Sequence, residues 1–251
     1  MHTTQYFVIM SSKIIEIRKT EEIYNLPKKN LFRDGYRPLE FLISENEAYK
    51  VARDKHKKIK ILIAPTWGEN NIFNHCIDEL LKNLVISDYE IHLRPHPMTL
   101  RNNYSQIQEL KKRYSSNNNF ILNEDHVDRK ILFESDILIT DWSGVGIEYG
   151  LGLLKPVIYI DTPKKNLNPE YRRINITPIE IGIRAKIGKI LNIRELSSIE
   201  EIISETIKTY NKNKVSILRD KFVFMKDNGL YKSAKRVISI ANSNHSRNIG
   251  H

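Results

Sequence analysis

Apolar and polar residues alternate in blocks along most of the chain. From residue 59 onward, short apolar runs are separated by longer segments in which apolar residues recur every three or four positions. The short runs predict buried strands, and the longer segments predict amphipathic helices. The expected strands are residues 59–64, 90–94, 119–122, 136–140 and 156–160, and the expected helices are residues 74–84, 104–114, 127–133 and 144–154. This alternation predicts an α/β fold, a doubly wound parallel sheet of the Rossmann-like type.

The opening of the chain has a different pattern. Residues 6–10 predict a strand, residues 13–24 a helix, and residues 30–38 a second strand that runs into a loop. This opening is too short to bury a core of its own. A basic stretch, residues 53–60, follows and has the composition of a connector. We therefore expect residues 1–56 to be a domain fragment with its connector.

The main domain is expected to cover residues 57–242, and residues 243–251 are expected to form a tail. The last part of this domain, residues 197–241, predicts mainly helix. Ile199 and Ile203 belong to an aliphatic stripe at helical spacing in this part. Such a stripe more often packs into the core of its own domain than against a partner.

The most informative segment is residues 135–148, where an apolar strand breaks into a helix through a turn of small residues. The run at residues 137–139 suits a parallel strand covered on both faces, and Ser143 can cap the helix that follows. Free N–H groups and the positive end of the helix dipole then converge where a phosphate can bind. Gly144 and Gly146 allow a ligand to approach closely. The alternative is an ordinary turn between a strand and a helix.

A second segment, residues 89–97, predicts a strand that ends in a rigid basic turn. Pro95 and Pro97 fix the backbone on both sides of His96, so its ring is held in place. Arg94 offers a planar fork that matches phosphate oxygens, and His96 can donate a hydrogen bond or transfer a proton near neutral pH. The alternative is that both side chains are solvated or cap a neighbouring helix. In an open α/β sheet, however, ligands bind at the carboxyl ends of the strands, and both segments end there.

The net charge of the chain favours some classes of binding partner over others. The chain has 251 residues and a net charge of +10 at pH 7, which favours nucleotides, phosphate polymers, nucleic acid or an anionic membrane surface. The basic residues are not interleaved with aromatic residues, so we expect no direct nucleic-acid binding.

The only cysteine, Cys76, excludes an internal disulfide and fits a reducing compartment. No apolar stretch reaches the ~18 residues of a membrane span and no secretory signal is present, so we expect a cytoplasmic protein.

The sequence contains no metal-binding pattern of a known type. It has no tight cluster of aspartate and glutamate residues. His92 and His96 are four residues apart, but they lie on a strand and a rigid turn, where they do not share a face as they would on a helix. We therefore expect ligand binding that needs no metal.

Three motifs, in this order, resemble the CDP-glycerol glycerophosphotransferase family of teichoic-acid and capsule polymerases. They lie at residues 61–67, 93–97 and 135–143. Residues 35–40 are also similar to the glycine-tyrosine-proline-arginine segment of this family, with two residues exchanged. The resemblance extends over roughly residues 5–240.

The third motif matches the family most closely. Members of the family have an aspartate-aromatic-serine-serine turn, with an acidic residue seven positions after the first aspartate. Asp141, Trp142, Ser143 and Glu148 occupy these places here. Gly144 departs from the usual second serine, so no hydroxyl is available at that position.

The resemblance implies the carboxyl-terminal half of a GT-B fold with a remnant of the amino-terminal half. It places His96 and the Ser143 turn on the diphosphate of an activated donor, with Arg94 in support, and it makes His96 the expected catalytic residue. The full set of expected donor-binding residues is Pro65, Thr66, Trp67, Arg94, His96, Asp141, Trp142, Ser143, Gly144 and Glu148.

Three of these residues have two open roles. Trp67 can stack on a base or cover the core. Asp141 can accept hydrogen bonds from hydroxyl groups of the donor, or it can fix its loop through backbone N–H groups. Glu148 can contact ribose hydroxyls or lie in a first helical turn that favours negative charge.

The function implied by the resemblance is a transferase that uses CDP-glycerol, or a related polyol phosphate, to build a cell-surface polymer on a polyol-phosphate or glycan acceptor. The first alternative is a GT-B nucleotide-sugar glycosyltransferase or epimerase. The second is a non-catalytic donor-binding half-enzyme that needs a partner chain. The family carries a histidine, the acceptor-activating base, in its amino-terminal half, and residues 1–59 contain no matching motif. The basic surface also suits peripheral docking on the inner face of the cell membrane.

Overall fold

The computed structural model describes residues 5–8, 11–49, 58–164, 171–224, 234–235, 237–239 and 242. Its centre is a six-stranded sheet in which all neighbouring strands are parallel. The strands are β3 (Ile59–Ile63), β4 (Tyr89–Leu93), β5 (Phe120–Leu122), β6 (Ile137–Thr140), β7 (Val157–Ile160) and β8 (Lys189–Leu191). The prediction of a doubly wound parallel sheet is therefore confirmed. The sequence pattern missed β8, a three-residue edge strand of which two residues are exposed.

The order of the strands is β5-β4-β3-β6-β7-β8. The chain first adds strands on one side of β3, then crosses to β6 and continues on the other side. The direction of winding therefore reverses between β3 and β6. In folds of this kind a crevice opens at this switch point, outside the carboxyl ends of the strands.

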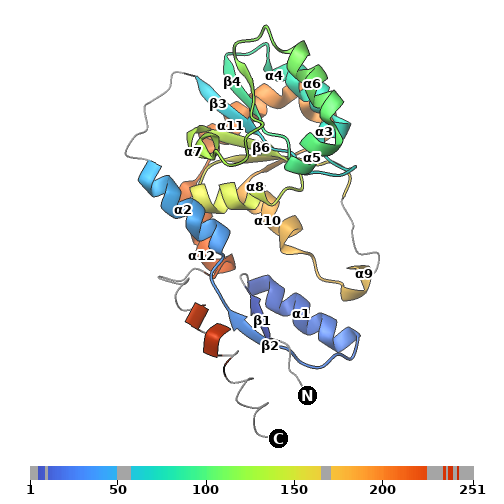
Figure 1. Ribbon diagram of the computed structural model, residues 1–251, viewed down its shortest axis with the longest axis vertical. Helices are drawn as coiled ribbons and strands as arrows, with labels where there is room; N and C mark the ends of the chain where they lie inside the picture. Colours follow the sequence, from blue (N-terminus) through green and yellow to red (C-terminus); the bar gives the residue numbers. More distant parts are fainter. Residues whose placement is uncertain are drawn as a thin grey trace, which may run out of the picture.

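Helices cover both faces of the sheet (Figure 1). Between β3 and β6 the chain forms α3 (Ile72–His75), α4 (Ile77–Leu84), α5 (Pro97–Asn102), α6 (Tyr104–Arg113) and α7 (Lys130–Glu134). After β6 it forms α8 (Val145–Ile147), the π-helix η2 (Glu148–Leu153), α9 (Tyr171–Ile174), α10 (Ile179–Ile187), the 3-10 helix η3 (Ile193–Ser198), α11 (Ile199–Thr209) and α12 (Lys212–Phe222).

Some predicted helices differ in detail. The helix expected at residues 74–84 is two helices that meet at Cys76, and the helix expected at residues 144–154 is α8 followed by η2. The helix expected at residues 127–133 begins only at Lys130. The sequence analysis missed α5, α9 and α10.

The core consists of two layers, because successive side chains of a strand point to opposite faces of the sheet. Ile61 and Ile63 of β3 pack in one layer with α3, α4, α6 and α11. Leu62 packs in the other layer with α2, α7, η2 and α10. Ile199 and Ile203 are fully buried in the first layer, which agrees with a core role for the aliphatic stripe.

The amino-terminal segment contributes to the main domain. β1 (Gln5–Val8) and β2 (Asn30–Arg33) form a separate parallel pair joined by α1 (Ser11–Ile23), in the lower part of Figure 1. The next helix, α2 (Arg37–Tyr49), packs instead on η2, and its Leu39 and Leu42 are buried in the second core layer. The proposed boundary near residue 57 and the tail at residues 243–251 lie outside the described residues.

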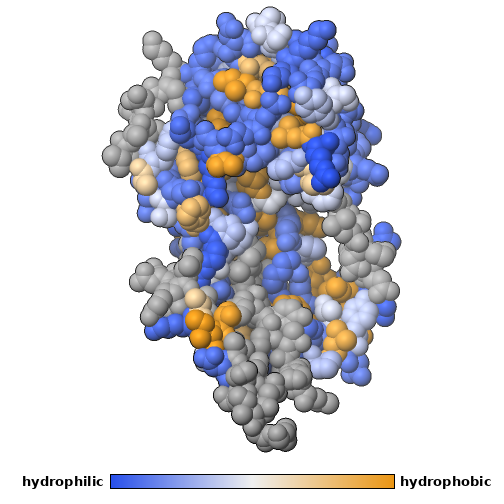
Figure 2. Space-filling model, viewed as in Figure 1, coloured by the Kyte–Doolittle hydropathy of each residue, from blue (hydrophilic) through white to orange (hydrophobic). Residues whose placement is uncertain are grey.

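The visible surface is mostly hydrophilic, with small and separate hydrophobic groups (Figure 2). Val127, Ile86 and Ile217 are among the exposed large apolar side chains, and they come from different elements. Single exposed apolar residues of this kind are normal for a folded protein. Within the described part of the chain, the helices are too short or too polar to span a membrane.

Candidate functional site

A cavity of about 300 Å³ lies at the carboxyl edge of the sheet, at the switch point. Residues that follow β3, β4, β5 and β6 line it, so the ends of four neighbouring strands meet there. Its polar lining consists of Arg94, His96, His126, Arg129, Ser143 and Glu148. Its apolar lining includes Pro38 and Leu42 of α2, Ala64, Pro65, Pro97, Leu132 and Val145.

The structure brings half of the predicted site residues to this cavity. Pro65, Arg94, His96, Ser143 and Glu148 line it. The other five predicted residues, Thr66, Trp67, Asp141, Trp142 and Gly144, are not among its lining residues. Most of these five residues contact other parts of the protein instead.

Asp141 fastens two loops together. Its side chain is fully buried, and its two carboxylate oxygens accept hydrogen bonds from the backbone N–H groups of Thr66 and Ile72, each at 2.9 Å. Burial raises the pKa of Asp141, while these N–H groups act in the opposite direction. Of the two roles left open by the sequence, the geometry favours the one in which Asp141 fixes the loop. Thr66, which is also buried, belongs to the same junction.

Trp142 also contacts other residues of the protein, outside the cavity lining. Its indole N–H donates to the carbonyl of Thr162 at 3.0 Å, and the guanidinium of Arg184 lies 3.8 Å from a ring centroid of the indole. Arg184 is itself almost completely buried and forms an ion pair with Asp161 at 3.2 Å. The stacking of Arg184 on Trp142 thus helps to fix the turn between β6 and α8.

The Ser143 turn differs from the predicted cap. Gly144, not Ser143, is the N-cap of α8, and no side chain caps the helix. The Ser143 carbonyl instead accepts a hydrogen bond from the N–H of Gly146 at 3.1 Å, and Ser143 lines the cavity. The N–H groups of Gly146 and Ile147 donate to the carbonyls of Ser143 and Gly144, so only the earlier N–H groups of the turn could bind an anion.

The two glycines of this turn have different roles. A Cβ on Gly144 would meet no atom within 4 Å, so this position is open. A Cβ on Gly146 would lie 2.6 Å from Cε1 of Tyr159 and 2.9 Å from Cγ2 of Thr140. Gly146 is therefore required for packing against the sheet, and not for the approach of a ligand as the sequence analysis expected.

His96 both caps a helix and lines the cavity. It is the N-cap of α5, and its Nδ1 accepts a hydrogen bond from the N–H of Met98 at 3.1 Å. Pro97 occupies the first turn, where its lack of an N–H is harmless. Because Nδ1 is an acceptor, the proton of the neutral ring lies on Nε2. His96 therefore has the capping role that was the alternative, and its Nε2–H is left as a possible donor to a ligand.

Trp67 lies beside His96. The two ring centroids are 6.1 Å apart with an angle of 33° between the planes. The Trp67 side chain is 42% exposed, so it does not cover the core. An exposed indole beside His96 can present its face to a planar ligand.

Arg94 connects two strand ends. Its guanidinium donates to the backbone carbonyl of His126, in the loop after β5, at 3.0 Å. Burial and the positive charge of Arg129 lower the pKa of Arg94, and an arginine remains charged at neutral pH despite such a shift. The carboxyl end of β4 thus carries a fixed positive charge at the cavity.

His126 and Arg129 were missed by the sequence analysis. Both lie beyond β5, the third strand end at this edge of the sheet, and both line the cavity. The segment between residues 123 and 130 has no motif, and its polar residues have the composition of a loop. The position of β5 beside β4 was the signal that could have identified them.

Glu148 links the site to the amino-terminal segment. The Tyr36 hydroxyl donates to a carboxylate oxygen of Glu148 at 2.7 Å. Burial and this hydrogen bond raise the pKa of Tyr36, which therefore stays protonated at neutral pH. Pro38 and Leu42 of α2 line the same side of the cavity. The segment at residues 35–40 therefore forms one wall of the site.

The comparison with protein families gives a clear result. The family model described as CDP-Glycerol:Poly(glycerophosphate) glycerophosphotransferase matches residues 2–240. The chain belongs to this family. Its members are transferases. A search among curated proteins found no match.

Solved structures of the wall teichoic acid polymerase TagF resemble the chain. One TagF variant soaked with CDPG covers 93% of this chain at 20% identity with a TM-score of 0.50, and a second variant covers 92% at 20% identity with the same TM-score. The match extends over 57% of each TagF chain. A UDP-GlcNAc 2-epimerase from Neisseria meningitidis covers 81% of this chain at 16% identity with a TM-score of 0.47, over 57% of its own length.

The likeness to TagF shows a common fold. The six-stranded, Rossmann-like sheet matches part of the TagF chains. The chain spans little more than half the length of the TagF chains that it matches, from 53% to 58%.

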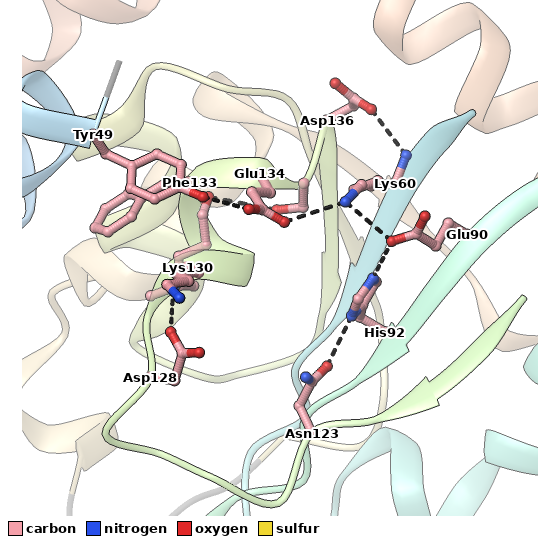
Figure 3. Close-up of polar contacts among 12 residues, drawn as sticks. Tyr49, Lys60, Glu90, His92, Asn123, Asp128, Lys130, Phe133, Glu134 and Asp136 are labelled. Atoms are coloured by element: carbon pink, nitrogen blue, oxygen red, sulfur yellow. Dashed lines mark hydrogen bonds and ion pairs between the residues drawn. The ribbon is translucent and has the colours of Figure 1, made fainter. Parts of the chain in front are cut away.

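A second polar cluster lies around residues of β3 and β4, outside the cavity lining (Figure 3). Lys60 of β3 lies between the carboxylates of Glu90 and Glu134, at 3.1 and 3.2 Å. Glu90 also contacts Nε2 of His92 at 2.7 Å, and Nδ1 of His92 is 3.0 Å from the side-chain oxygen of Asn123. Both ring nitrogens of His92 are thus used within the protein, and this histidine does not contribute to the cavity.

His92 and His96 are consequently in different environments. Among the residues that the structure describes, no group of three or more histidine, cysteine, aspartate or glutamate side chains could hold a metal ion. The polar lining of the candidate site combines arginine, histidine and serine side chains with one carboxylate, Glu148.

Proposed function

We propose that the chain binds a CDP-activated polyol phosphate, with CDP-glycerol as the leading candidate, and takes part in its transfer to a cell-surface polymer. Membership of the glycerophosphotransferase family supports this proposal. Its main support is the cavity at the switch point, where Arg94, His96 and the Ser143 turn meet. These are donors of hydrogen bonds, and a diphosphate presents only acceptors.

In the proposed reaction, a hydroxyl oxygen of the acceptor attacks the phosphorus that carries the polyol. The bond from this phosphorus to the bridging oxygen breaks, CMP leaves with the electron pair, and the proton of the acceptor hydroxyl is released to solvent. Negative charge develops on the bridging and terminal oxygens during this step. Arg94, the N–H group of His96 and the backbone N–H groups at the Ser143 turn are placed to stabilise this charge, and stabilisation of this kind is a major source of rate enhancement.

Two further assignments belong to this proposal. Trp67 is exposed beside His96 and can stack on the base of the nucleotide. The free oxygen of Glu148 is a candidate acceptor for a ribose hydroxyl, since the other oxygen is bound to Tyr36. We propose that donor binding in this cavity requires no metal ion.

Two forms of this proposal are open, a chain that transfers by itself and a donor-binding half that works with a second chain. Release of CMP from CDP-glycerol in the presence of a polyol-phosphate acceptor distinguishes the two. Release by the isolated chain establishes an enzyme, and release only after addition of a second chain establishes a half-enzyme.

The donor class is tested by isothermal titration of the chain with CDP-glycerol, UDP-glucose and CMP. We expect CDP-glycerol to bind most tightly. Binding of UDP-glucose alone would replace the proposal with a nucleotide-sugar enzyme of the same architecture.

The site assignment is tested with His96→Ala and Ser143→Ala. A hydrogen bond to a charged group contributes about 1.5–3 kcal/mol, so His96→Ala should weaken CDP-glycerol binding by roughly 10- to 150-fold. Ser143→Ala should have a smaller effect of about 3- to 10-fold, as for a neutral donor. His75→Ala is the control, because His75 is exposed on α3, outside the cavity lining. Unchanged affinity in both site variants would disprove the assignment.

A further inference from the structure

His126 is the residue of the cavity whose contacts are least explained by the proposed function. It lies in the loop between β5 and α7 and lines the cavity together with Arg94 and His96. Arg94 holds this loop in place through its hydrogen bond to the His126 carbonyl at 3.0 Å. The position of the imidazole beside the proposed diphosphate site is therefore fixed by the same guanidinium that contributes to that site.

The two ring nitrogens of His126 have different surroundings. The ring forms a hydrogen bond with the backbone of Pro95, and because proline has no N–H group, the Pro95 carbonyl must be the acceptor. Nε2 is enclosed and has no hydrogen-bond partner among the described residues. The donor to Pro95 is therefore Nδ1, and Nε2 is the nitrogen left for a further partner. A buried polar atom without a partner is costly, and it often marks a functional position.

The charges around His126 keep its ring neutral. Burial is the largest influence that lowers the pKa of His126, followed by the positive charge of Arg94 and by His96; the hydrogen bond to Pro95 and the nearby Asp125 act in the opposite direction. Arg129 and Glu148 line the same cavity from the loop before α7 and from η2. Burial and the positive charge of Arg94, which follows β4, thus dominate the balance.

We propose that His126 is an additional ligand of the diphosphate, and that its Nε2 takes up a proton from solvent when the diphosphate binds. The inference rests on the proposed function, because it assumes that a diphosphate occupies the space beside Arg94 and His96. Two negative charges placed there favour the protonated ring, against the burial and the positive charge of Arg94 that keep it neutral. The protonated Nε2 then donates to a phosphate oxygen, while Nδ1 keeps its bond to the Pro95 carbonyl.

Proton uptake makes ligand affinity depend on pH. If one proton is taken up with each ligand, affinity increases up to about tenfold for each unit of decrease in pH. This dependence applies between the pKa of His126 in the complex and its lowered pKa in the free protein. Above the first value the ligand binds without the proton, and below the second value the ring is already protonated, so affinity is constant in both regions.

Isothermal titration in two buffers of different ionisation enthalpy measures this uptake directly. CDP-glycerol and UDP-glucose are suitable ligands, because their diphosphates are diesters that do not titrate near neutral pH. The test variant is His126→Asn, whose side-chain amide can still donate to the Pro95 carbonyl but cannot be protonated. His75→Asn is the matched control, since His75 is exposed on α3.

We expect the unmodified chain and His75→Asn to take up a substantial fraction of a proton at pH 7, and His126→Asn to take up almost none and to bind more weakly. Binding without proton uptake, or equal uptake by His126→Asn, would overturn the role of His126 and leave the proposed function intact. Proton-linked binding of UDP-glucose without binding of CDP-glycerol would overturn the proposed donor and support His126. Failure of both ligands to bind would overturn the site and the inference together.

A structural effect of the substitution is distinguished by a second variant. His126→Gln places an uncharged amide near the position of Nε2. If both variants keep the thermal unfolding midpoint of the unmodified chain and both lose the proton uptake, the effect belongs to the titration of His126. If the uptake persists in either folded variant, another group is responsible and the inference fails.

Discussion

The role of Asp141 gives the sharpest test of how the site is held together. Its carboxylate is fully buried and accepts one hydrogen bond from the N–H of Thr66 and one from the N–H of Ile72, each at 2.9 Å. Asp141→Asn keeps the size of the side chain and replaces one acceptor oxygen by an NH₂ group. One of the two backbone N–H groups then faces another donor and loses its partner.

The expected cost follows from these contacts. A hydrogen bond to a charged group contributes about 1.5–3 kcal/mol, and a buried donor without a partner costs about 1–3 kcal/mol. Relief from burying a charge offsets part of this loss, since burial raises the pKa of Asp141. We therefore expect Asp141→Asn to lower the free energy of unfolding by about 2–3 kcal/mol. For a domain of this size the unfolding midpoint falls by about 4–12 °C.

Urea unfolding followed by circular dichroism measures the free energy, and differential scanning fluorimetry measures the midpoint. Asp88→Asn is the control, because the Asp88 side chain is 82% exposed and forms an ion pair with Lys58 at 2.6 Å. An exposed ion pair contributes about 0–1 kcal/mol, so this variant should remain close to the unmodified chain. Since Asp141 joins the β3 loop to the β6 turn, we also expect weaker binding of CDP-glycerol by Asp141→Asn at a temperature where it is folded.

A loss of stability no larger than that of Asp88→Asn would show that the two N–H groups find other partners, and that Asp141 is not the link between the loops. Unchanged stability with lost nucleotide binding would instead restore the alternative role, in which Asp141 contacts the donor itself.

Two further predictions concern packing and pH. Gly146→Ala should lower the free energy of unfolding by about 1–3 kcal/mol, because the new methyl group meets Tyr159 at 2.6 Å, whereas Gly144→Ala should have little effect, because it meets no atom within 4 Å. Burial raises the pKa values of Glu90 and Glu134, but hydrogen bonds from neighbours that include Lys60 outweigh this and lower both below 4.5. Their contribution to stability is therefore present above about pH 4.5 and is lost as pH falls through the lowered pKa values.

Urea unfolding measures both effects. Equal stability of the two glycine variants would contradict the packing role of Gly146. For the carboxylates, the double variant Glu90→Gln and Glu134→Gln should be less stable than the unmodified chain at pH 7, and the difference should shrink between about pH 5 and pH 3. A difference that is constant over this range would exclude a contribution from ionisation.

Particular elements show how far the sequence could predict the fold. The central strands β3, β6 and β7 were identified because their apolar residues form unbroken runs, as expected when both faces of a strand are buried. β8 and α5 were missed because each is short and carries few apolar residues. A periodic pattern cannot be recognised over three to six residues. Elements of this length also depend on contacts with their neighbours for stability.

The same contrast applies to the site. Pro65, Arg94, His96, Ser143 and Glu148 line the cavity, and each lies in a motif that the sequence displays. His126 and Arg129 lie in a polar loop without a motif, and only the pairing of β5 with β4 brings that loop to the cavity. Asp141 and Trp142 were recognised as important, but their contacts with Thr66 and Arg184 could not be known from their spacing.

The sequence by itself determined the alternation of strands and helices, the parallel sheet and the two strand ends that carry His96 and Ser143, because these depend on local periodicity and on residues close together in the chain. The tertiary structure alone decided which loops meet at the cavity. It also decided which residues of the sequence motifs line the cavity and which are buried away from it. These depend on strand order and on the direction of each side chain. Both arise from packing between segments far apart in the chain, which no local pattern records.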